Sequence, residues 1–502
     1  MNQLVEKKYL RYNTLAALLN QVVNLCCSFV LPRLILLQYG SATNGLVTSI
    51  TQFLGFISLM EFGVGAVIQS SLYKPLSEND KDTISMVVKS ANLFFRNIAR
   101  VLVVYTVFLM LFFCSFANVK ESPVYVALMI LVLSINTFAQ YYFGITNQLL
   151  LNADQKSYIQ LLLNSLAVFL NTLICVLLIK IGASILIVKL FSAIVLLIRP
   201  IGMSIYVNKH YAIDRKIQVT GNPIEQKWNG LYHHIASFVL QHTDVAVLTV
   251  FSSLESVSIY GVYQLVTNGL NQVVTILTTG HQAFFGALYA RNDYRLKTEF
   301  EAFEWKLHNA ITMVFTVAGV LISGFVVIYT NGAADAQYAQ PLFGSLLAFA
   351  QGACCLRMPY NIMVKAAGHY KQTQNSALIE ALLNIGISIV LVRTFGLVGV
   401  AIGTLIAMLY RTIYLAAYIG KYIVRRGIQV FIKQCTVDAL IVVLTISVRY
   451  MLPLNMNNYL DFLLQGIMTT LIAMIFAAIC NVVFYRDKLV KFFNEIKMKC
   501  RW

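Results

Sequence analysis

Amide and hydroxyl side chains recur at helical spacing within one long apolar stretch, residues 256–284. Residues three and four apart lie on the same face of a helix. Such a polar face can hold neighbouring helices together by hydrogen bonds, or it can line a water-filled cavity that accepts polar cargo. Because the polar positions continue over about five turns, we favour the cavity. The positions are Gln264, Asn268, Asn271, Thr275, Thr278 and Gln282.

Four other apolar stretches carry shorter polar faces. For these faces, interhelical hydrogen bonding and a cavity lining both remain open. From them we add Gln241 and Asn147 to Gln264, Asn268 and Asn271 as predicted substrate-binding residues. The four faces are Asn13, Asn20 and Asn24; Asn136, Gln140 and Asn147; Gln160, Asn164 and Asn171; and His234, Ser237, Gln241 and Asp244.

Charged residues also interrupt the apolar stretches, where a charge is costly and usually functional. Arg357, followed by Pro359, lies well inside an apolar run. We predict that it faces the cavity as a cation; the alternative is an ion pair with Glu380 or Asp244. Arg33 follows Pro32, so it either snorkels to the interface or marks a kinked helix end beside the cavity. We include Arg33 and Arg357 among the predicted substrate-binding residues.

Three carboxylates, Glu61, Asp244 and Glu380, are our candidates for coupling to a proton or sodium gradient. Glu61 has an alternative role, because it could hold an arginine in place. For the remaining membrane-embedded charges we expect structural roles: Arg199, Arg411 and Asp438.

Composition identifies the setting of these residues. The chain has 502 residues, of which 58% are hydrophobic and 12% charged, and its mean hydropathy is +0.71. Soluble domains are about 25% charged, so we predict an all-α polytopic membrane protein. A membrane span needs about 20 apolar residues. That rule places fourteen helices, at 12–37, 43–70, 98–117, 124–148, 157–179, 184–207, 229–250, 256–284, 307–329, 340–365, 375–393, 397–420, 431–451 and 461–484.

The net charge of +17 follows the topology and does not indicate nucleic-acid binding. With the N-terminus inside, 29 Lys and Arg fall on the inner side and six on the outer side. Because Lys and Arg accumulate in cytoplasmic loops, both termini are predicted to be cytoplasmic. The outer loops are short, so any function must be carried out within the membrane.

The chain also carries an internal repeat. Asn147 corresponds to Asn361, and the segment between Ala153 and Gly182 corresponds to that between Ala367 and Gly396, both at an offset of 214 residues. We therefore predict an N-terminal lobe at 1–215 and a C-terminal lobe at 216–430. Helices 13 and 14 with a basic tail fill 431–502. Because six helices return the chain to the same side, the two lobes should share one orientation.

Enzymatic chemistry is not supported by the sequence. It contains no GxSxG, HExxH or P-loop motif, so we expect no enzyme, no resident cofactor and no nucleotide-driven pump. Cysteines lie mostly in apolar runs without metal-ligand spacing. We expect them to be buried apolar residues, and we expect no metal site.

One region resembles a known family. Residues 31–75 contain a Pro32-Arg33 pair, a turn from Tyr39 to Leu46, a Glu61-Phe62-Gly63 element and a basic segment after Pro75. Together with fourteen helices in two lobes, these features resemble bacterial polysaccharide-biosynthesis flippases of the MATE/MOP exporter superfamily. The resemblance implies that the chain flips undecaprenyl-diphosphate-linked oligosaccharide for O-antigen, capsule or exopolysaccharide export.

The resemblance also implies a mechanism and a location. Two lobes would enclose a cavity that faces each side of the bacterial cytoplasmic membrane in turn, with Arg33 and Arg357 contacting the diphosphate. Membrane lipid would be a partner, and other glycan-assembly proteins are candidate partners; nucleic acid would not be a partner. The alternatives are a cation-coupled small-molecule or drug exporter, a non-transporting scaffold of a glycan-assembly complex, and a glycan polymerase or ligase. The short outer loops argue against the last.

Overall fold

The described part of the chain is helical. The computed structural model describes residues 3–61, 63–115, 121–214, 217, 231–278, 280–453 and 456–499. These ranges contain no β-strand, which confirms the all-α prediction. Internal contacts divide the chain into two compact units, Met1–Ser258 (unit 1) and Ile259–Trp502 (unit 2), which are described separately. The lobe boundary expected at 215/216 lies outside the described residues, and the lobes stay a prediction.

Ten helical segments within the described ranges are long and apolar enough to cross a membrane, as expected for a multi-pass membrane protein. Helices α1 (Gln3–Gly55) and α15 (Tyr370–Tyr422) each contain two expected spans, or parts of them, joined at a kink. The kinks lie at Gly40 and Gly396, whose φ angles are 83° and 53°. Glycine adopts positive φ without the strain that a Cβ atom causes. The total of fourteen spans stays a prediction.

Unit 1 is built around α1, which packs against α6 and α9, while α4 packs against α3 and α7. After α1 come η1 (Phe56–Glu61), α2 (Val64–Glu78), α3 (Lys81–Ser115), α4 (Pro123–Ala139), the π-helix η2 (Gln140–Gly144), α5 (Ile145–Ala153), α6 (Ser157–Lys180), α7 (Ile185–Leu196), α8 (Ile198–His210), α9 (Leu231–Phe251) and the start of α10 (Leu254–Thr278).

Local sequence signals explain where two of these helices begin. The side chain of Asp80 accepts a hydrogen bond from the N–H of Thr83 (3.1 Å) and caps α3. Hydrogen bonds from the hydroxyl and the N–H of Thr83 lower the pKa of Asp80. Ser122 caps α4 in the same way, and Pro123 occupies its first turn, where its missing N–H is not needed. Helix α3 is continuous from its charged beginning into the apolar span.

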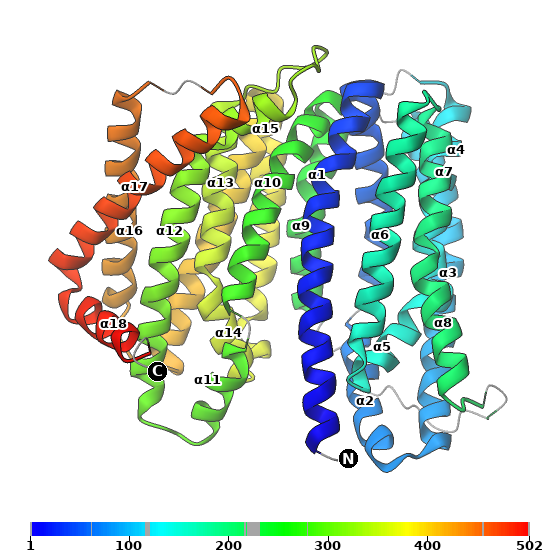
Figure 1. The fold of residues 1–502 in the computed structure, drawn as a ribbon, viewed down its shortest axis with the longest axis horizontal. Coiled ribbons are helices and arrows are strands. Elements are labelled where there is room, and N and C mark those ends of the chain that lie inside the picture. Colours follow the sequence, from blue (N-terminus) through cyan, green and yellow to red (C-terminus); the bar gives the residue numbers. More distant parts are fainter. Residues whose placement is uncertain are drawn as a thin grey trace. The chain divides into compact units, whose positions relative to one another are not determined.

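Unit 2 contains the rest of α10 and the C-terminal helices. Helix α12 packs against α13, α16 and α17, and α13 packs against α15. The last helices lie beside α12, with α17 crossing α16 obliquely (Figure 1). The elements are α11 (His281–Ala290), α12 (Arg295–Tyr329), α13 (Pro341–Leu356), α14 (Met358–Ala366), α15, α16 (Gln429–Met451), α17 (Tyr459–Phe484) and α18 (Arg486–Lys499).

Candidate functional site

The amide residues of α10 form an open face of unit 2. Asn268 is exposed, and Gln264 and Asn271 are half-buried. The neighbouring face of the same helix carries Tyr263 and Val274, which are both buried in unit 2. Asn271 lies beside Cys355 of α13 (3.6 Å), whereas the exposed side chain of Asn268 is accessible to a polar ligand.

Tyr263 fixes this helix in place. Its hydroxyl donates to the carbonyl of Tyr338 (2.9 Å) and accepts from the N–H of Gln340 (3.0 Å) just before α13. The ring lies so close to Gly344 that a Cβ at that glycine would be 2.5 Å from a ring carbon. These contacts hold α10 against α13.

Three buried charged residues of unit 2 lie in contact with one another. The guanidinium of Arg357 contacts one carboxylate oxygen of Glu380, and Arg411 binds the other oxygen at 2.6 Å. Glu380 is fully buried, and both arginines are buried. Arg357 stands between α13 and α14, where Pro359 interrupts the helix, while Glu380 and Arg411 come from opposite sides of the Gly396 kink.

This cluster shows the ion pair with Glu380 that was the alternative role for Arg357. One carboxylate is shared by two guanidinium groups, and the Nε atoms of both arginines are buried without a hydrogen-bond partner. The cluster thus retains an excess positive charge and two unused donors. Substrate contact by Arg357 and ion coupling by Glu380 stay predictions.

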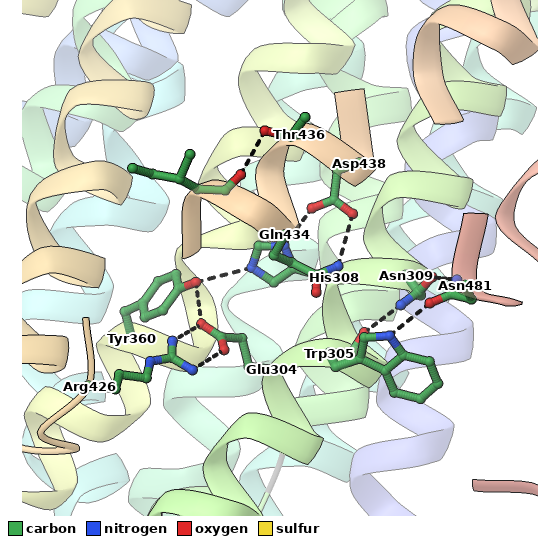
Figure 2. Close-up of polar contacts among 11 residues, drawn as sticks. Glu304, Trp305, His308, Asn309, Tyr360, Arg426, Gln434, Thr436, Asp438 and Asn481 are labelled. Carbon is green, nitrogen blue, oxygen red and sulfur yellow. Dashed lines mark hydrogen bonds and ion pairs between the residues drawn. The ribbon is translucent and has the colours of Figure 1, made fainter. Parts of the chain in front are cut away.

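Unit 2 contains a second buried polar network, which the sequence did not lead us to expect (Figure 2). Arg426 binds both carboxylate oxygens of Glu304, one of them at 2.6 Å. The hydroxyl of Tyr360 donates to Glu304 Oε1 (2.6 Å). Two-pronged pairing of this kind gives the strongest charge-assisted contacts, so Glu304 is held in its charged form.

His308 extends this network to α16. Its Nε2 atom lies 3.2 Å from the Tyr360 hydroxyl, and its Nδ1 atom lies 2.6 Å from Asp438 Oδ2. Because the tyrosine hydrogen goes to Glu304, the hydrogen between Tyr360 and His308 belongs to Nε2. A further proton must then lie between Nδ1 and Asp438. His308 thus links Tyr360 and Glu304 to Asp438 of α16.

The sequence signal for this network was the spacing of Glu304 and His308. They are four residues apart on α12, so they share a face. Asp438 was expected to be structural, and in unit 2 it pairs with a buried histidine; its role stays a prediction. Glu304 and His308 were not singled out, because spacing along one helix does not show that Tyr360, Arg426 and Asp438 pack against them. A cluster of three or more metal-ligating side chains does not occur in the described ranges.

In unit 1, Glu61 lies at a break in regular structure. It ends the 3-10 helix η1, and α2 begins after Gly63, which has a φ of 76°. The hydroxyl of Tyr141 donates to Glu61 Oε1 (2.6 Å) from the π-helix η2. Two interrupted helices thus meet at one carboxylate, and such interruptions frequently accompany functional sites. Ion coupling by Glu61 stays a prediction.

The predicted residues of α9 occupy two environments. Gln241 is exposed, whereas Asp244 is buried. Between them, His242 stacks on Phe238 and its Nδ1 atom contacts the side-chain oxygen of Gln52 from α1. The side chains of residues 231–237 lie outside the described set, so His234 and Ser237 are not placed.

Arg199 of unit 1 contacts amide side chains. Arg199 donates to Gln148 (2.7 Å) and Asn164 (3.4 Å), and Asn164 in turn donates to Asn20 (2.8 Å). The interhelical hydrogen-bond alternative therefore describes Asn20 and Asn164. Arg33 is half-buried on α1, one residue after Pro32.

Asn147 lies apart from the other predicted residues of unit 1. Its amide donates to the carbonyl of Phe143 (2.8 Å), and it lines a pocket with Lys89 and Arg96 of α3. This pocket lies on the α3 and α8 side of unit 1.

Comparison with known proteins shows the fold. No protein-family model and no curated protein sequence matches the chain. Lipid II flippase MurJ in an inward closed conformation matches with a TM-score of 0.71 and 16% identity, over 95% of this chain and 99% of that one. The chain therefore has a MurJ/MATE-like fold.

Two transporters of the MOP superfamily match less completely. A multidrug resistance MATE transporter in an outward-facing conformation has a TM-score of 0.50 and 15% identity, over 82% of this chain and 95% of that one. A Pyrococcus furiosus transporter, described as having a binding pocket of reverse polarity, has a TM-score of 0.54 and 15% identity, over 84% of this chain and 96% of that one.

Proposed function

We propose that this protein is a membrane transporter that flips undecaprenyl-diphosphate-linked oligosaccharide from the cytoplasmic to the outer leaflet by alternating access. The observation that carries the proposal is the match to a lipid flippase over 95% of the chain. The match to a MATE drug transporter covers 82%. Because the flippase match covers 95% of the chain, it includes part of the C-terminal helices α16 and α17.

The open amide face of α10 supports a sugar-bearing cargo. A hydroxyl group that leaves water without a hydrogen-bond partner costs several kcal/mol, and amide side chains replace those bonds. Gln264, Asn268 and Asn271 are the residues that we assign to sugar hydroxyls. Arg33 is assigned to the diphosphate, since the guanidinium of Arg357 is already shared with Glu380.

Depletion of the protein in its native cells tests this function. Lipid-linked saccharides are extracted and their leaflet is determined with a membrane-impermeant probe. The proposal expects an intact undecaprenyl-linked oligosaccharide trapped on the cytoplasmic side, whose mass identifies the cargo. Transfer to the outer face at an undiminished rate, in cells without a second flippase gene, would refute it.

A cation-coupled small-molecule exporter is the second candidate. The buried contact between His308 and Asp438 (2.6 Å) supports it, because proton-coupled transport needs a buried side chain of a type that can bind and release protons. In proteoliposomes, this candidate expects an imposed pH gradient to drive uptake of a cationic dye in the absence of any lipid-linked sugar. The flippase proposal expects no such uptake.

A further inference from the structure

A pocket with a volume of about 480 Å³ lies within unit 1, between α3, η2, α5 and α8. All of its lining residues belong to unit 1, and none belongs to α10. The polar residues that line it are Lys89, Asn92, Arg96, Tyr142, Asn147, Ser204 and Asn208.

The charge of this pocket is one-sided. Lys89 and Arg96 are cationic, and the described residues that line the pocket include no carboxylate. The guanidinium of Arg96 stacks over the ring of Tyr142 at 4.8 Å, which orients it. Its Nε atom is buried and has no hydrogen-bond partner. The pocket therefore contains an oriented guanidinium group whose Nε donor is unused. A bound anion would balance its charge and accept its hydrogen bond.

Lys89 is held at the same pocket by a different contact. Its ammonium group donates to the backbone carbonyl of Ile217 (2.6 Å). A carbonyl oxygen satisfies one of the three donors of an ammonium group, so the others remain available for a ligand. Amide groups from α3 and α5 complete a set of donors of the kind that binds phosphate oxygens.

The rim of the pocket is apolar. Leu93 of α3, and Ile201 and Ile205 of α8, are exposed by 48%, 43% and 62%. In a membrane protein, exposed aliphatic side chains contact lipid chains. The pocket-lining part of α3 also precedes the apolar run expected to begin at residue 98, so we expect the pocket at the level of lipid headgroups.

We propose that this pocket binds the phosphate-bearing headgroup of an anionic membrane lipid in the leaflet at the N-terminal end of α3. Arg96 and Lys89 pair with the phosphate, Asn92 and Asn147 donate to its oxygens, and the lipid chains lie along Leu93, Ile201 and Ile205. The site is independent of whatever the protein transports, because it requires none of the α10 residues.

The test is a binding measurement on the purified full-length protein in a neutral detergent. Dioctanoyl phosphatidylglycerol is titrated, and the thermal unfolding midpoint is followed to saturation. We expect Arg96→Gln and Lys89→Gln to weaken binding about tenfold each, as expected when one charge-assisted contact is lost. Arg100→Gln is the matched control. Arg100 is one turn further along α3, is exposed, pairs with Asn97 (2.9 Å) and does not line the pocket.

Each arm of the experiment has a decisive outcome. Equal losses in Arg96→Gln and Arg100→Gln would overturn the proposal, because general surface charge would then explain binding. Inorganic phosphate should compete only at much higher concentration than the lipid; equal affinity would show that the ligand is a free anion. Equal affinity for dioctanoyl phosphatidylcholine would show that net negative charge is not recognised. If Arg96→Gln fails to fold, Lys89→Gln carries the test.

Discussion

Arg426 reaches its partner from a turn and not from a helix. After α15, the N–H of Arg426 bonds back to the carbonyl of Gly420 (2.7 Å), and the preceding Arg425 has a φ of 54°. This turn directs the Arg426 side chain onto Glu304. Burial lowers the pKa of Arg426, but the hydrogen bonds and charge of Glu304 raise it by more. The pair is therefore charged, and its energetic importance lies in what happens when one partner is lost.

Arg426→Gln should lower the stability of the protein by about 3–5 kcal/mol, because it leaves the charge of Glu304 buried and unpaired. The measurement is the midpoint of thermal unfolding in detergent. Arg425→Gln is the control, since Arg425 is adjacent and exposed. The double variant Arg426→Gln/Glu304→Gln should recover much of the loss. A single variant as stable as the Arg425 control would contradict a buried charge pair.

At the scale of elements, a close approach of two helix backbones explains Gly45, which belongs to the Tyr39–Leu46 turn of the family resemblance. A Cβ at Gly45 of α1 would lie 1.8 Å from the carbonyl oxygen of Leu254, at the start of α10. Beside it, the Asn44 amide donates to Ser258 (2.8 Å), and Ser49 bonds Thr249 at the same distance. Small and polar residues thus allow helices of unit 1 to touch through their backbones, as is common between membrane helices.

Gly45→Ala should therefore destabilise the protein by about 1–3 kcal/mol, the usual cost of overpacking. The control is Gly386→Ala in α15, where no atom lies within 4 Å of the new methyl group. That substitution should be neutral or stabilising by up to about 1 kcal/mol, because alanine favours helix more than glycine does. Equal thermal midpoints for the two variants would show that α1 and the start of α10 do not touch.

Helix α17 is docked to α12 by a polar anchor, which gives a second prediction at this scale. The indole of Trp305 donates to Asn481 (2.8 Å), whose amide donates to Asn309 (2.5 Å). Asn481→Leu should cost about 1–3 kcal/mol, since the buried indole donor loses its partner. Thr470→Val is the control on the same helix, because its exposed hydroxyl only bonds its own backbone. Proteolytic release of the C-terminal helices should rise in Asn481→Leu alone.

At the scale of the whole molecule, the two units provide different partners for their buried arginines. Arg411 of unit 2 pairs with Glu380, whereas Arg199, near the equivalent position of the repeat, donates to the amide oxygens of Gln148 and Asn164. Unit 2 also contains the Glu304–His308–Asp438 network. Arg411 is therefore held by a charged partner and Arg199 by neutral amides, at positions that the predicted repeat makes nearly equivalent.

Transport should depend on the amide face of α10 without a matching loss of stability. Asn268→Leu is expected to lower the flipping rate of a lipid-linked oligosaccharide in proteoliposomes about fivefold, equivalent to one lost hydrogen bond of about 1 kcal/mol. Because Asn268 is exposed, thermal unfolding should not shift downward. Leu277→Ala, at an exposed apolar position of the same helix, should transport normally. An unchanged rate in Asn268→Leu would remove this face from the proposed pathway.

Parts of the site were predictable because they depend on one helix at a time. Helical spacing indicated that Gln264, Asn268 and Asn271 share a face of α10, but the expected face was too long, because α10 ends at Thr278 and Gln282 lies on α11. The same reasoning did not anticipate that Asn147 would lie beside Lys89 and Arg96, because spacing along one helix does not say which neighbour a face meets. It left two roles open for Arg357, and the contact with Glu380 was seen only once α13 and α15 were packed together.

The sequence by itself determined the membrane class and the helical architecture, because the length of an apolar run decides whether a segment crosses a bilayer. It also supplied the glycines at which α1 and α15 bend. Only the tertiary structure decided the partners of the buried charges. His308 and Asp438 are 130 residues apart, and Arg426 and Glu304 are 122 apart. Such pairs arise from the packing of distant helices, which local periodicity does not encode.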